Sequence, residues 1–541
     1  MSQVYVLNTG VKREQGRKAQ LSNIAAGKAI ADIIRSTLGP KSMLKMILDP
    51  MGGIVLTSDG NAILREIDVS HPAAKSIIEL SRVQDDQVGD GTTSVIVLAG
   101  EMLTVAEPYL HKHIHPTDIT QGYFKALDDA INIIDTKLTM TIDPNNVEQV
   151  SRVVNACVGT TFMKAYSSLM TKLAIRAVNI VSTDAFGKQQ IDTKRYAKVE
   201  KIPGGEFNEC RVMNGVMLNK DITHSKMRRR VVKPRILLLD CPLEYKKGES
   251  ITNIEVSKMT DWNAYLQLEE ETVKKMCNDI IKFKPDIVFT EKGMSDLAQH
   301  FFVKAGITGI RRLRKTDNNR IARAVGATIC HSTEDIKESD IGTECGLFEI
   351  RKIGDQYFTF IEQCKNPKAC TIVLRGASKD ILNEIERNLH DAIGVVRNTM
   401  LDPRVVYGGG AVEMAVSQEL TERAKSIEGL WQYPYQSCAL ALECIPRQLA
   451  KNCGADVVRL VTKLRHEHST YDSKVHKNRN IGINGITGKL DDMEKLGLLE
   501  PYAVKVQTIK TAIESACMLL RIDEVVSGMS KKEHPQGAVQ Q

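Results

Sequence analysis

The sequence predicts a multidomain protein of mixed α+β and α/β class, with helical ends and a central α/β region. The chain has 541 residues, and a single hydrophobic core stops growing at about 250–300 residues, so two or more domains are expected. Apolar residues in the first third recur at helical spacing. Short apolar runs bounded by turn residues begin near residue 190, and helical spacing returns from about residue 378.

The first third is predicted to consist mainly of helices. One helix is expected over residues 21–38, and Gly39-Pro40 ends it because proline cannot continue a helix. The apolar residues 46–48 and 54–56 flank a turn with proline and glycine, which predicts a β-hairpin. Further helices are expected after residue 93, over 118–140 and within 147–182.

The central region is predicted to form an α/β domain. Strands expected at 235–240 and 285–290 alternate with helices expected at 261–283 and 293–305. Helical spacing then continues towards the end of the chain, interrupted once by a run of three glycines. The residues from Ser530 onwards are polar and contain proline and glycine, so we expect a disordered tail.

The composition is that of an ordinary soluble globular protein. Hydrophobic residues make up 42% and charged residues 26%, and a net charge of +7 is mild for this length. Charge alone therefore does not indicate nucleic acid or a membrane surface. The N-terminus has no apolar segment behind a basic start, and no apolar stretch approaches the roughly 20 residues of a membrane helix. We therefore expect the protein in the cytosol or the nucleus.

The 12 cysteines form no Cys-x-x-Cys pair, so neither a zinc ribbon nor a thioredoxin-type site is indicated. In a reducing compartment most of them are expected to behave as small buried apolar residues. Cys364 and Cys370 flank an Asn-Pro turn signal and could face each other across a hairpin. A functional disulfide between them is the less favoured interpretation in that compartment.

The strongest local signal is Gly89-Asp90-Gly91-Thr92-Thr93-Ser94, which opens a helix. Glycines allow a ligand to approach the backbone, and the free N–H groups at a helix start favour phosphate. The three hydroxyls add donors, and Asp90 suits a magnesium ion that bridges phosphates. The alternative is a turn followed by a capped helix, with Thr92 as the cap. The motif alone does not decide between the two.

Standard nucleotide-binding loops do not occur. A Walker A loop needs G-x-x-x-x-G-K-[ST], whereas the nearest match, from Gly482 to Leu490, has one residue too many and lacks the final hydroxyl. The run from Gly408 to Glu413 does not match G-x-G-x-x-G. A P-loop or Rossmann enzyme is therefore disfavoured.

Two further patterns have ordinary explanations. His111, His113 and His115 alternate with other residues, but no second ligand cluster accompanies them, so a polar helix end is favoured over a metal site. The basic runs 226–235 and 311–315 lack interleaved aromatic residues. We interpret them as solvated faces rather than as a nucleic-acid site.

Five motifs together resemble the group II chaperonins, in the order of that family. They are Thr37-Leu38-Gly39-Pro40-Lys41, Thr57-Ser58-Asp59-Gly60-Asn61-Ala62, Gly89-Asp90-Gly91-Thr92-Thr93-Ser94, His390-Asp391-Ala392 and Gly408-Gly409-Gly410-Ala411. The set is specific and covers essentially the whole chain, although each motif alone is weak. The chain is most similar to the eukaryotic cytosolic type, CCT or TRiC. Residues 48–53 and 520–523 resemble one particular subunit type of that complex.

The resemblance implies a chaperonin fold with nested domains. A helical equatorial ATPase domain would come from both chain ends, an intermediate hinge domain from two inner pieces, and an α/β apical domain with a helical protrusion from the centre. The expected boundaries are 1–144 and 403–529 for the equatorial domain, 145–214 and 369–402 for the intermediate domain, 215–368 for the apical domain and 530–541 for the tail.

The resemblance also implies roles for individual residues. Asp59 and Asp391 would act in catalysis by positioning and polarising the attacking water, and Asp90 would hold Mg²⁺ and bind ATP. A lone helical aspartate such as Asp391 would otherwise be interpreted as a surface carboxylate. The other implied ATP-binding residues are Gly39, Gly91, Thr92, Thr93, Ser94, Thr160, Gly409, Gly410, Glu500 and Lys505, with Gly409 and Gly410 against the nucleoside and Glu500 at the ribose.

The implied activity is ATP hydrolysis that drives lid closure around a non-native polypeptide. The implied cofactors are ATP and Mg²⁺, with K⁺ as a further candidate. The implied partners are seven paralogous subunits in an eight-membered ring, with two rings stacked, clients such as actin and tubulin, and co-chaperones; neither nucleic acid nor a membrane is expected. Candidate client-binding elements are the helix near 317–326, with Ile321 and Val325, and the protrusion near 249–275.

Two departures from the family pattern bear on hydrolysis. The family often has a lysine near residue 160 that senses the nucleotide, whereas this chain has Gly159-Thr160-Thr161 and a lysine only at Lys164. Tyr407 stands where the family commonly has proline, which predicts a less rigid loop. A second hypothesis is therefore a ring subunit that binds polypeptide and hydrolyses ATP weakly or not at all. A stand-alone small-molecule kinase is disfavoured because no Walker loop occurs.

Overall fold

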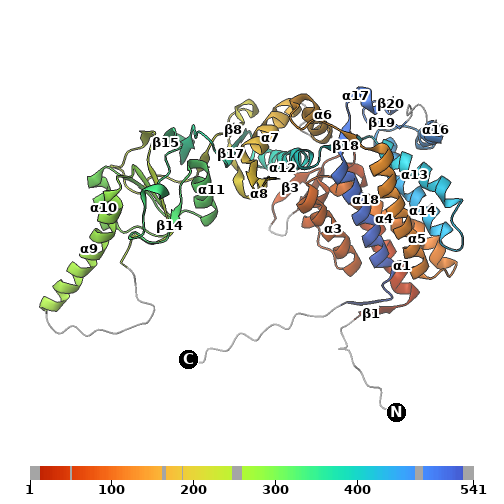
Figure 1. Cartoon of the computed structure of the whole chain (residues 1–541). Coiled ribbons are helices and arrows are strands. Elements are labelled where there is room, and N and C mark those ends of the chain that lie inside the picture. The colour runs from red at the N-terminus through yellow and green to blue at the C-terminus, as the bar shows by residue number, and fades with distance from the viewer. Residues whose placement is uncertain are drawn as a thin grey trace, which may run out of the picture. The chain divides into compact units, whose positions relative to one another are not determined.

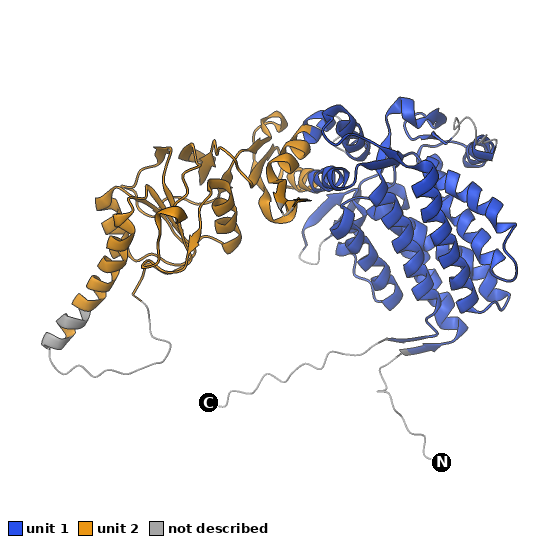
Figure 2. Cartoon of the chain, in the orientation of Figure 1, with its two compact units in different colours: residues 1–171, 387–541 blue, residues 172–386 orange. Residues whose placement is uncertain are grey.

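The chain forms two compact units, and its two ends belong to the same one. The computed structural model describes residues 12–48, 52–160, 166–185, 187–245, 259–469 and 479–527. Unit 1 combines Met1–Thr171 with Arg387–Gln541, and unit 2 is Lys172–Glu386 (Figures 1 and 2). The residue patterns alone did not show that the first and last thirds fold together. The limits of a separate intermediate domain stay a prediction.

Unit 1 is mainly helical, as expected. Its helices are α1 (Arg17–Ile34), α2 (Gly60–Glu66), α3 (Pro72–Val88), α4 (Thr92–His111), α5 (Pro116–Ile133), α6 (Val147–Val158), α13 (Ala411–Ala424), α14 (Gln432–Leu442), α15 (Cys444–Asn452), α16 (Val457–Ser469), α17 (Met493–Leu496) and α18 (Tyr502–Leu520). A 3₁₀ turn, Arg35–Thr37, follows α1, and a π-helical turn, Ile134–Leu138, extends α5. Two helices, α7 (Ser167–Val181) and α12 (Lys379–Leu401), run across the boundaries between the units.

Helix α4 forms the centre of the core of unit 1. It packs against α1, α3, α14 and α18, which come from both ends of the chain. Its apolar residues are therefore buried on several sides, and Ile96, Leu98 and Met102 are among the largest fully buried side chains. The core that forms here fixes the start of α4, at Thr92, relative to the C-terminal segments.

Short strands join distant segments of unit 1. They are β1 (Lys12–Gln15), β2 (Lys45–Leu48), β3 (Ile54–Thr57), β4 (Met140–Thr141), β18 (Arg404–Tyr407), β19 (Ile481–Asn484), β20 (Lys489–Asp492), β21 (Leu499–Pro501) and β22 (Glu524–Ser527). Strands β2 and β3 form the predicted hairpin. Strand β1 pairs antiparallel with β22, and β18 lies between β4 and β21. The C-terminal strands were not predicted, because their runs of three or four residues lack a clear alternation.

Unit 2 contains three larger sheets with helices against them. A parallel sheet has the order β13 (Thr308–Ile310), β12 (Ile287–Thr290), β11 (Ile236–Leu239), β14 (Ile329–Cys330). An antiparallel sheet has the order β10 (Arg230–Val232), β15 (Leu347–Ile353), β16 (Gln356–Glu362), β9 (Val216–Leu218), and a third has β7 (Ala197–Pro203), β17 (Cys370–Gly376), β8 (Arg211–Met213). The remaining strands are β5 (Thr183–Ala185) and β6 (Lys188–Gln190), and the helices are α8 (Thr193–Tyr196), α9 (Met259–Lys282), α10 (Asp296–Ala305) and α11 (Lys315–Val325).

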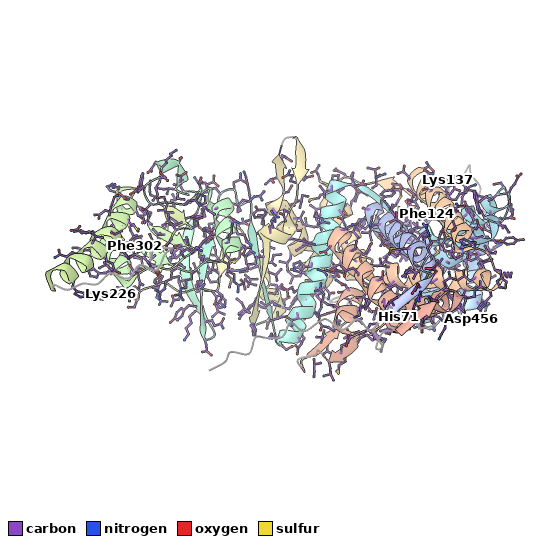
Figure 3. The ribbon with its side chains drawn as sticks, turned by 90° about the horizontal axis from the view of Figure 1, so that it is seen from below. His71, Phe124, Lys137, Lys226, Phe302 and Asp456 are labelled. Carbon is purple, nitrogen blue, oxygen red and sulfur yellow. The ribbon has the colours of Figure 1, made fainter. Side chains whose placement is uncertain are left out.

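The parallel sheet and the helices α9 and α10 agree with the predicted α/β region. Its strands are buried on both faces, which explains their continuous apolar sequences. Phe302 of α10, labelled in Figure 3, is fully buried in this core. Two predictions lie outside the described residues: the tail from Ser530, and most of the protrusion segment before α9.

The interpretation of helix α11 in unit 2 is wrong, whereas that of a basic run is confirmed. Ile321 and Val325 of α11 are fully buried in its core, so they do not form an apolar patch for a client. The basic run 226–235 is solvated, as expected, since Lys226, Arg228, Arg229, Arg230 and Lys233 are exposed. The ion pairs of Arg228 with Asp286 and of Arg235 with Glu338 lie at the surface. Helical spacing does not report which face of an element the fold covers.

The proposed Cys364–Cys370 hairpin is also wrong. Strand β16 pairs with β15 and β9, whereas β17, which begins at Cys370, pairs with β7 and β8. The Cys364 side chain lies against Cys345 instead. All 12 cysteines are free thiols, and most are buried, as expected for small apolar residues. Within the described part of the chain, no helix is long and apolar enough to cross a membrane.

Candidate functional site

A cavity of about 520 Å³ lies in unit 1, between the start of α4 and the C-terminal segments. Its lining comes from stretches that are hundreds of residues apart in the sequence. Every residue to which the family resemblance assigned a role in nucleotide binding or hydrolysis contributes to this lining: Gly39, Asp59, Asp90, Gly91, Thr92, Thr93, Ser94, Thr160, Asp391, Gly409, Gly410, Glu500 and Lys505. A common location does not by itself establish their roles.

The turn between α3 and α4 forms one wall of the cavity. Gly91 precedes α4 with φ 79°, in the left-handed region that glycine adopts readily. A Cβ atom on Gly91 would lie 2.9 Å from Thr508 Oγ1, so only glycine fits without displacement. No side chain caps α4, and Thr92 is its first helical residue rather than its cap. The interpretation of Thr92 as a cap is therefore wrong, and the first N–H groups of α4 have no capping side chain to satisfy them.

Asp59 links this turn to the preceding segment. It caps α2, since its carboxylate accepts hydrogen bonds from the backbone of Asn61 (3.2 Å) and Ala62 (3.0 Å). The Thr92 hydroxyl also donates to Asp59 Oδ1, at 3.1 Å. These bonds hold the Asp59 carboxylate beside the start of α4, where the cavity lies.

Asp90 occupies the same wall. Its Oδ1 accepts a hydrogen bond from the Gly91 N–H at 2.6 Å. Burial raises the pKa of Asp90, and the neighbouring charge of Asp59 adds to the rise, while the Gly91 N–H, Cys157 and Lys505 act in the opposite direction. Asp391 reaches the cavity from α12. Three carboxylates from three separate segments therefore surround one space.

Glu500 and Lys505 belong to a buried charged group. Lys505 Nζ lies 2.6 Å from Glu413 Oε1 and 2.8 Å from Glu500 Oε2. Burial alone would lower the pKa of Lys505, but the two carboxylates outweigh it and the pKa rises. Burial also raises the pKa of Glu500, whereas Lys505 lowers it. Lys505 is thus held by two carboxylates, so its ammonium is not an unpaired cation directed at a ligand.

The three-glycine run contacts the β19–β20 hairpin. The Ile483 N–H donates to the Gly409 carbonyl at 2.9 Å. Gly409 has φ 67°, and a Cβ atom there would lie 2.7 Å from Met493 Sδ and 3.0 Å from the Ile483 carbonyl. Tyr407 does not lie in a loop, since it ends β18 and is paired with Leu499 of β21. The glycines therefore allow two backbone segments to meet at the edge of the cavity.

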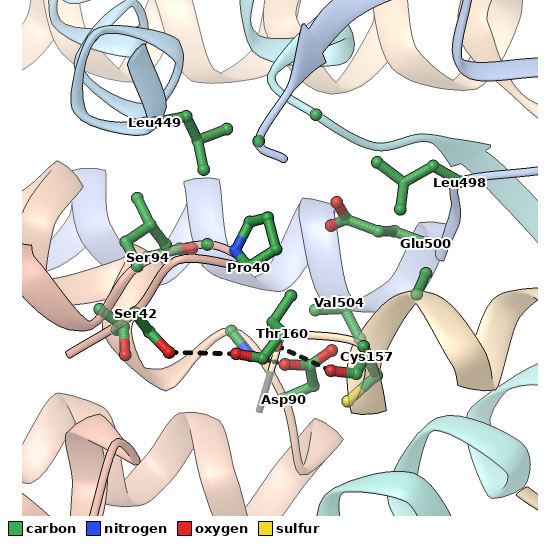
Figure 4. A pocket seen from close by; sticks show the side chains of 18 of the residues that line it. Pro40, Ser42, Asp90, Ser94, Cys157, Thr160, Leu449, Leu498, Glu500 and Val504 are labelled. Atoms are coloured by element: carbon green, nitrogen blue, oxygen red, sulfur yellow. Dashed lines mark hydrogen bonds between the residues drawn. The ribbon is translucent and has the colours of Figure 1, made fainter. Parts of the chain in front are cut away.

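A third wall comes from the end of α6. The Thr160 hydroxyl donates to the Cys157 carbonyl at 2.8 Å, and the Ser42 hydroxyl donates to the Thr160 carbonyl at 3.1 Å (Figure 4). Figure 4 shows Asp90 beside Cys157 and Thr160, and Glu500 nearer to Leu498. Lys164, the lysine that follows Thr160 in the sequence, lies outside the described residues.

Sequence reasoning missed several lining residues. They include Ser42, Asn155, Cys157, Asn388, Leu449, Asn484, Gly485, Leu498, Val504 and Thr508. Asn484 and Gly485 belong to the segment that fails as a Walker loop, and that segment forms a hairpin beside the cavity instead. Asn388 stands three residues before Asp391, so the helical spacing of polar residues in α12 was a usable signal.

The donors around the cavity fit a magnesium nucleotide better than a metal held by protein alone. Among the described residues, no group of three or more His, Cys, Asp or Glu side chains could hold a metal. Magnesium in phosphate sites is usually held by one or two carboxylates together with substrate phosphates and water. Asp90 beside uncapped N–H groups and the hydroxyls of Thr92, Thr93 and Ser94 provides such a set.

The three histidines have separate structural contacts. His111 ends α4 and lies 3.8 Å from Glu107, His113 contacts Arg17, and His115 caps α5 by accepting from the Thr117 N–H. The polar-helix-end interpretation therefore holds for His111, whereas His115 stands at a helix start.

Comparison with known proteins decides the family. The TCP-1/cpn60 chaperonin family model matches residues 30–530. The chain belongs to this chaperonin family. It is 59% identical to the T-complex protein 1 subunit gamma of Thalassiosira weissflogii over 98% of this chain and 99% of that protein. It is also 59% identical to the gamma subunit of Dictyostelium discoideum, with 98% and 99% covered, and 57% identical to that of Bos taurus, with 98% and 96% covered.

These matches confirm the chaperonin fold and the resemblance to the cytosolic type. The relatives are gamma subunits, which is the subunit type that residues 48–53 and 520–523 predicted. The roles of individual residues in this chaperonin chain stay predictions.

Proposed function

We propose that this chaperonin subunit binds and hydrolyses ATP and thereby drives the folding of other polypeptides inside a ring. One observation carries the proposal: Asp59, Asp90 and Asp391, from three separate segments, line the same cavity. Phosphoryl transfer depends mainly on positioning and on charge neutralisation, which this arrangement can supply. The chaperonin relatives support the folding role.

Residues at different places in the cavity have different proposed roles in binding and hydrolysing ATP. The N–H groups at the start of α4 and its hydroxyls hold phosphate oxygens. Asp59 and Asp391 accept hydrogen bonds from the attacking water, which orients and polarises it, and one of the two carboxylates takes up the proton that the water loses as it reacts. When bound, magnesium neutralises phosphate charge, and Asp90 is the side chain that would hold it. Glu500 accepts from ribose hydroxyls, and Gly409 and Gly410 let the nucleoside lie against the backbone.

Hydrolysis is coupled to movement through α12. This helix carries Asp391 in unit 1 and begins in unit 2, within the predicted intermediate domain. A change in the position of α12 would therefore change both the site and the course of the chain into unit 2. The proposed result is closure of the apical lid over a client.

The proposed assembly consists of two stacked rings of eight subunits. Each ring would contain this subunit and seven paralogous subunits. Its proposed place is the cytosol, and the proposed clients are non-native proteins such as actin and tubulin. The relatives' name, T-complex protein 1 subunit gamma, supports membership of a complex. K⁺ as an additional cofactor rests on the family resemblance alone.

A second candidate function is a ring subunit with weak or absent hydrolysis. One observation favours it: Lys505, the only cation among the described lining residues, is already held by Glu413 and Glu500. The phosphate end of the cavity would then depend on neutral donors and on the metal.

The two functions are separated by the nucleotide state of this subunit in the assembled ring. Complexes incubated with ATP and magnesium are frozen at successive times, and the nucleotide density in this cavity is resolved by electron microscopy. Conversion of ATP into ADP in this subunit, abolished by Asp391→Ala, supports hydrolysis. Persistent ATP in the unmodified subunit supports the non-hydrolysing alternative.

A further inference from the structure

Asn388 is a buried amide at the edge of the proposed nucleotide cavity, and its Nδ2 atom has no hydrogen-bond partner. It stands three residues before Asp391 on α12, so the two side chains share a helix face. Its side chain lines the cavity and is 2% exposed. Its Nδ2 atom is enclosed and has no hydrogen-bond partner. Among the described lining residues, it is the only one with such an unsatisfied buried side-chain nitrogen or oxygen.

An unsatisfied buried donor is unfavourable, since its bonds to water are lost without replacement. Buried asparagines are normally held by the protein, as Asn398 on the same helix shows. Its Nδ2 donates to the Val88 carbonyl at 2.7 Å. Asn388 therefore has the properties of a ligand-binding side chain rather than of a structural one. It is buried among packed residues, and its amide group can still donate hydrogen bonds to a ligand.

The charge around the site indicates what this donor would meet. Four carboxylates, those of Asp59, Asp90, Asp391 and Glu500, line the cavity. Its one described cation, Lys505, is already held by Glu413 and Glu500. An entering phosphate group would lie near several negative charges. A neutral N–H donor on the helix of Asp391 offsets that repulsion without adding a titratable group.

We propose that the Asn388 side-chain amide donates a hydrogen bond to an oxygen of the γ-phosphoryl group as that group is transferred to water. In this role Asn388 is a catalytic residue that touches the substrate. Asp59 and Asp391 accept from the attacking water, so they cannot donate to the phosphoryl oxygens, and Asn388 supplies a donor from the same helix face as Asp391. The inference rests on the proposed hydrolysis of ATP at this site.

The test uses complete rings in which the partner subunits carry the change equivalent to Asp391→Ala, so that the remaining turnover reports this subunit. Asn388→Leu, of similar size, removes the donor. We expect turnover about 100-fold lower, the usual effect of removing one such donor, with the affinity for ATP changed by less than about threefold. Asn388→Ser keeps a hydroxyl donor and should recover part of the turnover. Affinity for ADP–aluminium fluoride should fall with turnover.

Thermal unfolding distinguishes catalysis from a structural role. Because Nδ2 has no partner, Asn388→Leu should leave the melting temperature equal or higher, whereas the matched variant Asn398→Leu breaks a bond and should lower it. Unchanged turnover in Asn388→Leu overturns the inference. So does a loss of turnover that is matched by an equal loss of ATP affinity and of stability. If rings with the unmodified subunit turn over ATP no faster than rings in which this subunit also carries Asp391→Ala, the proposed hydrolysis at this site fails rather than the role of Asn388.

Discussion

Units 1 and 2 differ in how far their function follows from local sequence. In unit 1 all the residues to which the family resemblance assigned a role in nucleotide binding or hydrolysis line one cavity, although they come from both ends of the chain. In unit 2 the apolar residues singled out as a client surface, Ile321 and Val325, belong to the core. Motifs of glycine, hydroxyl and carboxylate residues favour the same local backbone geometry wherever their segment lies in the fold. Apolar residues do not indicate a function in this way, because protein cores and binding surfaces use the same apolar side chains.

The largest expected effect is in unit 1, at Asp391. Replacing it with alanine removes the group proposed to orient and polarise the attacking water, and should slow hydrolysis at this site by about 1,000-fold, within the usual range for a general base. ATP should still bind, because the start of α4 is unchanged. Turnover and ATP affinity are measured in rings whose other sites are inactive. If Asp391→Ala weakened ATP binding by as large a factor as it slowed hydrolysis, the assignment of Asp391 to the attacking water would be wrong.

The next effect tests the core interpretation of unit 2. Ile321→Ala should lower the free energy of unfolding of that unit by about 3 kcal/mol, because it leaves a cavity in a packed core. Hydrogen exchange of β11 and β12 should rise accordingly. Trp262 of α9, which is exposed, is the matched comparison, and Trp262→Ala should change stability by less than about 0.5 kcal/mol. If Ile321→Ala is equally harmless, Ile321 is not a core residue.

A smaller effect compares two glycines with similar backbone angles, one in each unit. Gly91→Ala introduces a Cβ atom 2.9 Å from Thr508 Oγ1, and should weaken nucleotide binding by about tenfold through displacement of the α4 start. Gly306 ends α10 with φ 74° and has open space around it, so Gly306→Ala should cost only about 1 kcal/mol of stability. Nucleotide titration of both variants checks this. Equal binding by the two would show that the α3–α4 turn tolerates a side chain.

The smallest effect concerns His468, beside the β19–β20 hairpin. Its Nε2 lies 2.9 Å from the Ile481 carbonyl, so the neutral ring donates there. Burial lowers the pKa of His468 below its usual value near 6.5. The unfolded segment therefore binds a proton more readily, and stability should decrease as the pH falls below about 6.5. His468→Gln keeps a donor without the charge and should remove this dependence, measured as the melting temperature between pH 7.5 and 5.5.

The sequence predicted the helical and α/β regions well, because their apolar spacing is long and regular. The helix at Thr92 and the hairpin β2–β3 follow from the glycine and proline positions together with the apolar residues beside them. The strands β18 to β22 were missed, since three or four residues cannot show a period. Family resemblance, rather than residue pattern, indicated that both chain ends share one unit.

The glycines, carboxylates and most hydroxyl residues of the site were predicted, whereas its asparagines were missed. Asn388 and Asn484 belong to no motif, and only the folded chain shows that they line the cavity. The ion pair between Lys505 and Glu413 could not be predicted either, because the two residues are 92 positions apart in the sequence. Such contacts depend on long-range packing, which local patterns do not contain.

The central claim is that Asp59, Asp90 and Asp391 act on one magnesium nucleotide. The direct test is the structure of the complete ring with magnesium, ADP and a phosphate analogue such as aluminium fluoride. We predict nucleotide density in this cavity, with the metal at Asp90 and the phosphate analogue between Asp59 and Asp391. An empty cavity in rings whose other subunits are occupied, or a nucleotide bound away from these carboxylates, would contradict the account.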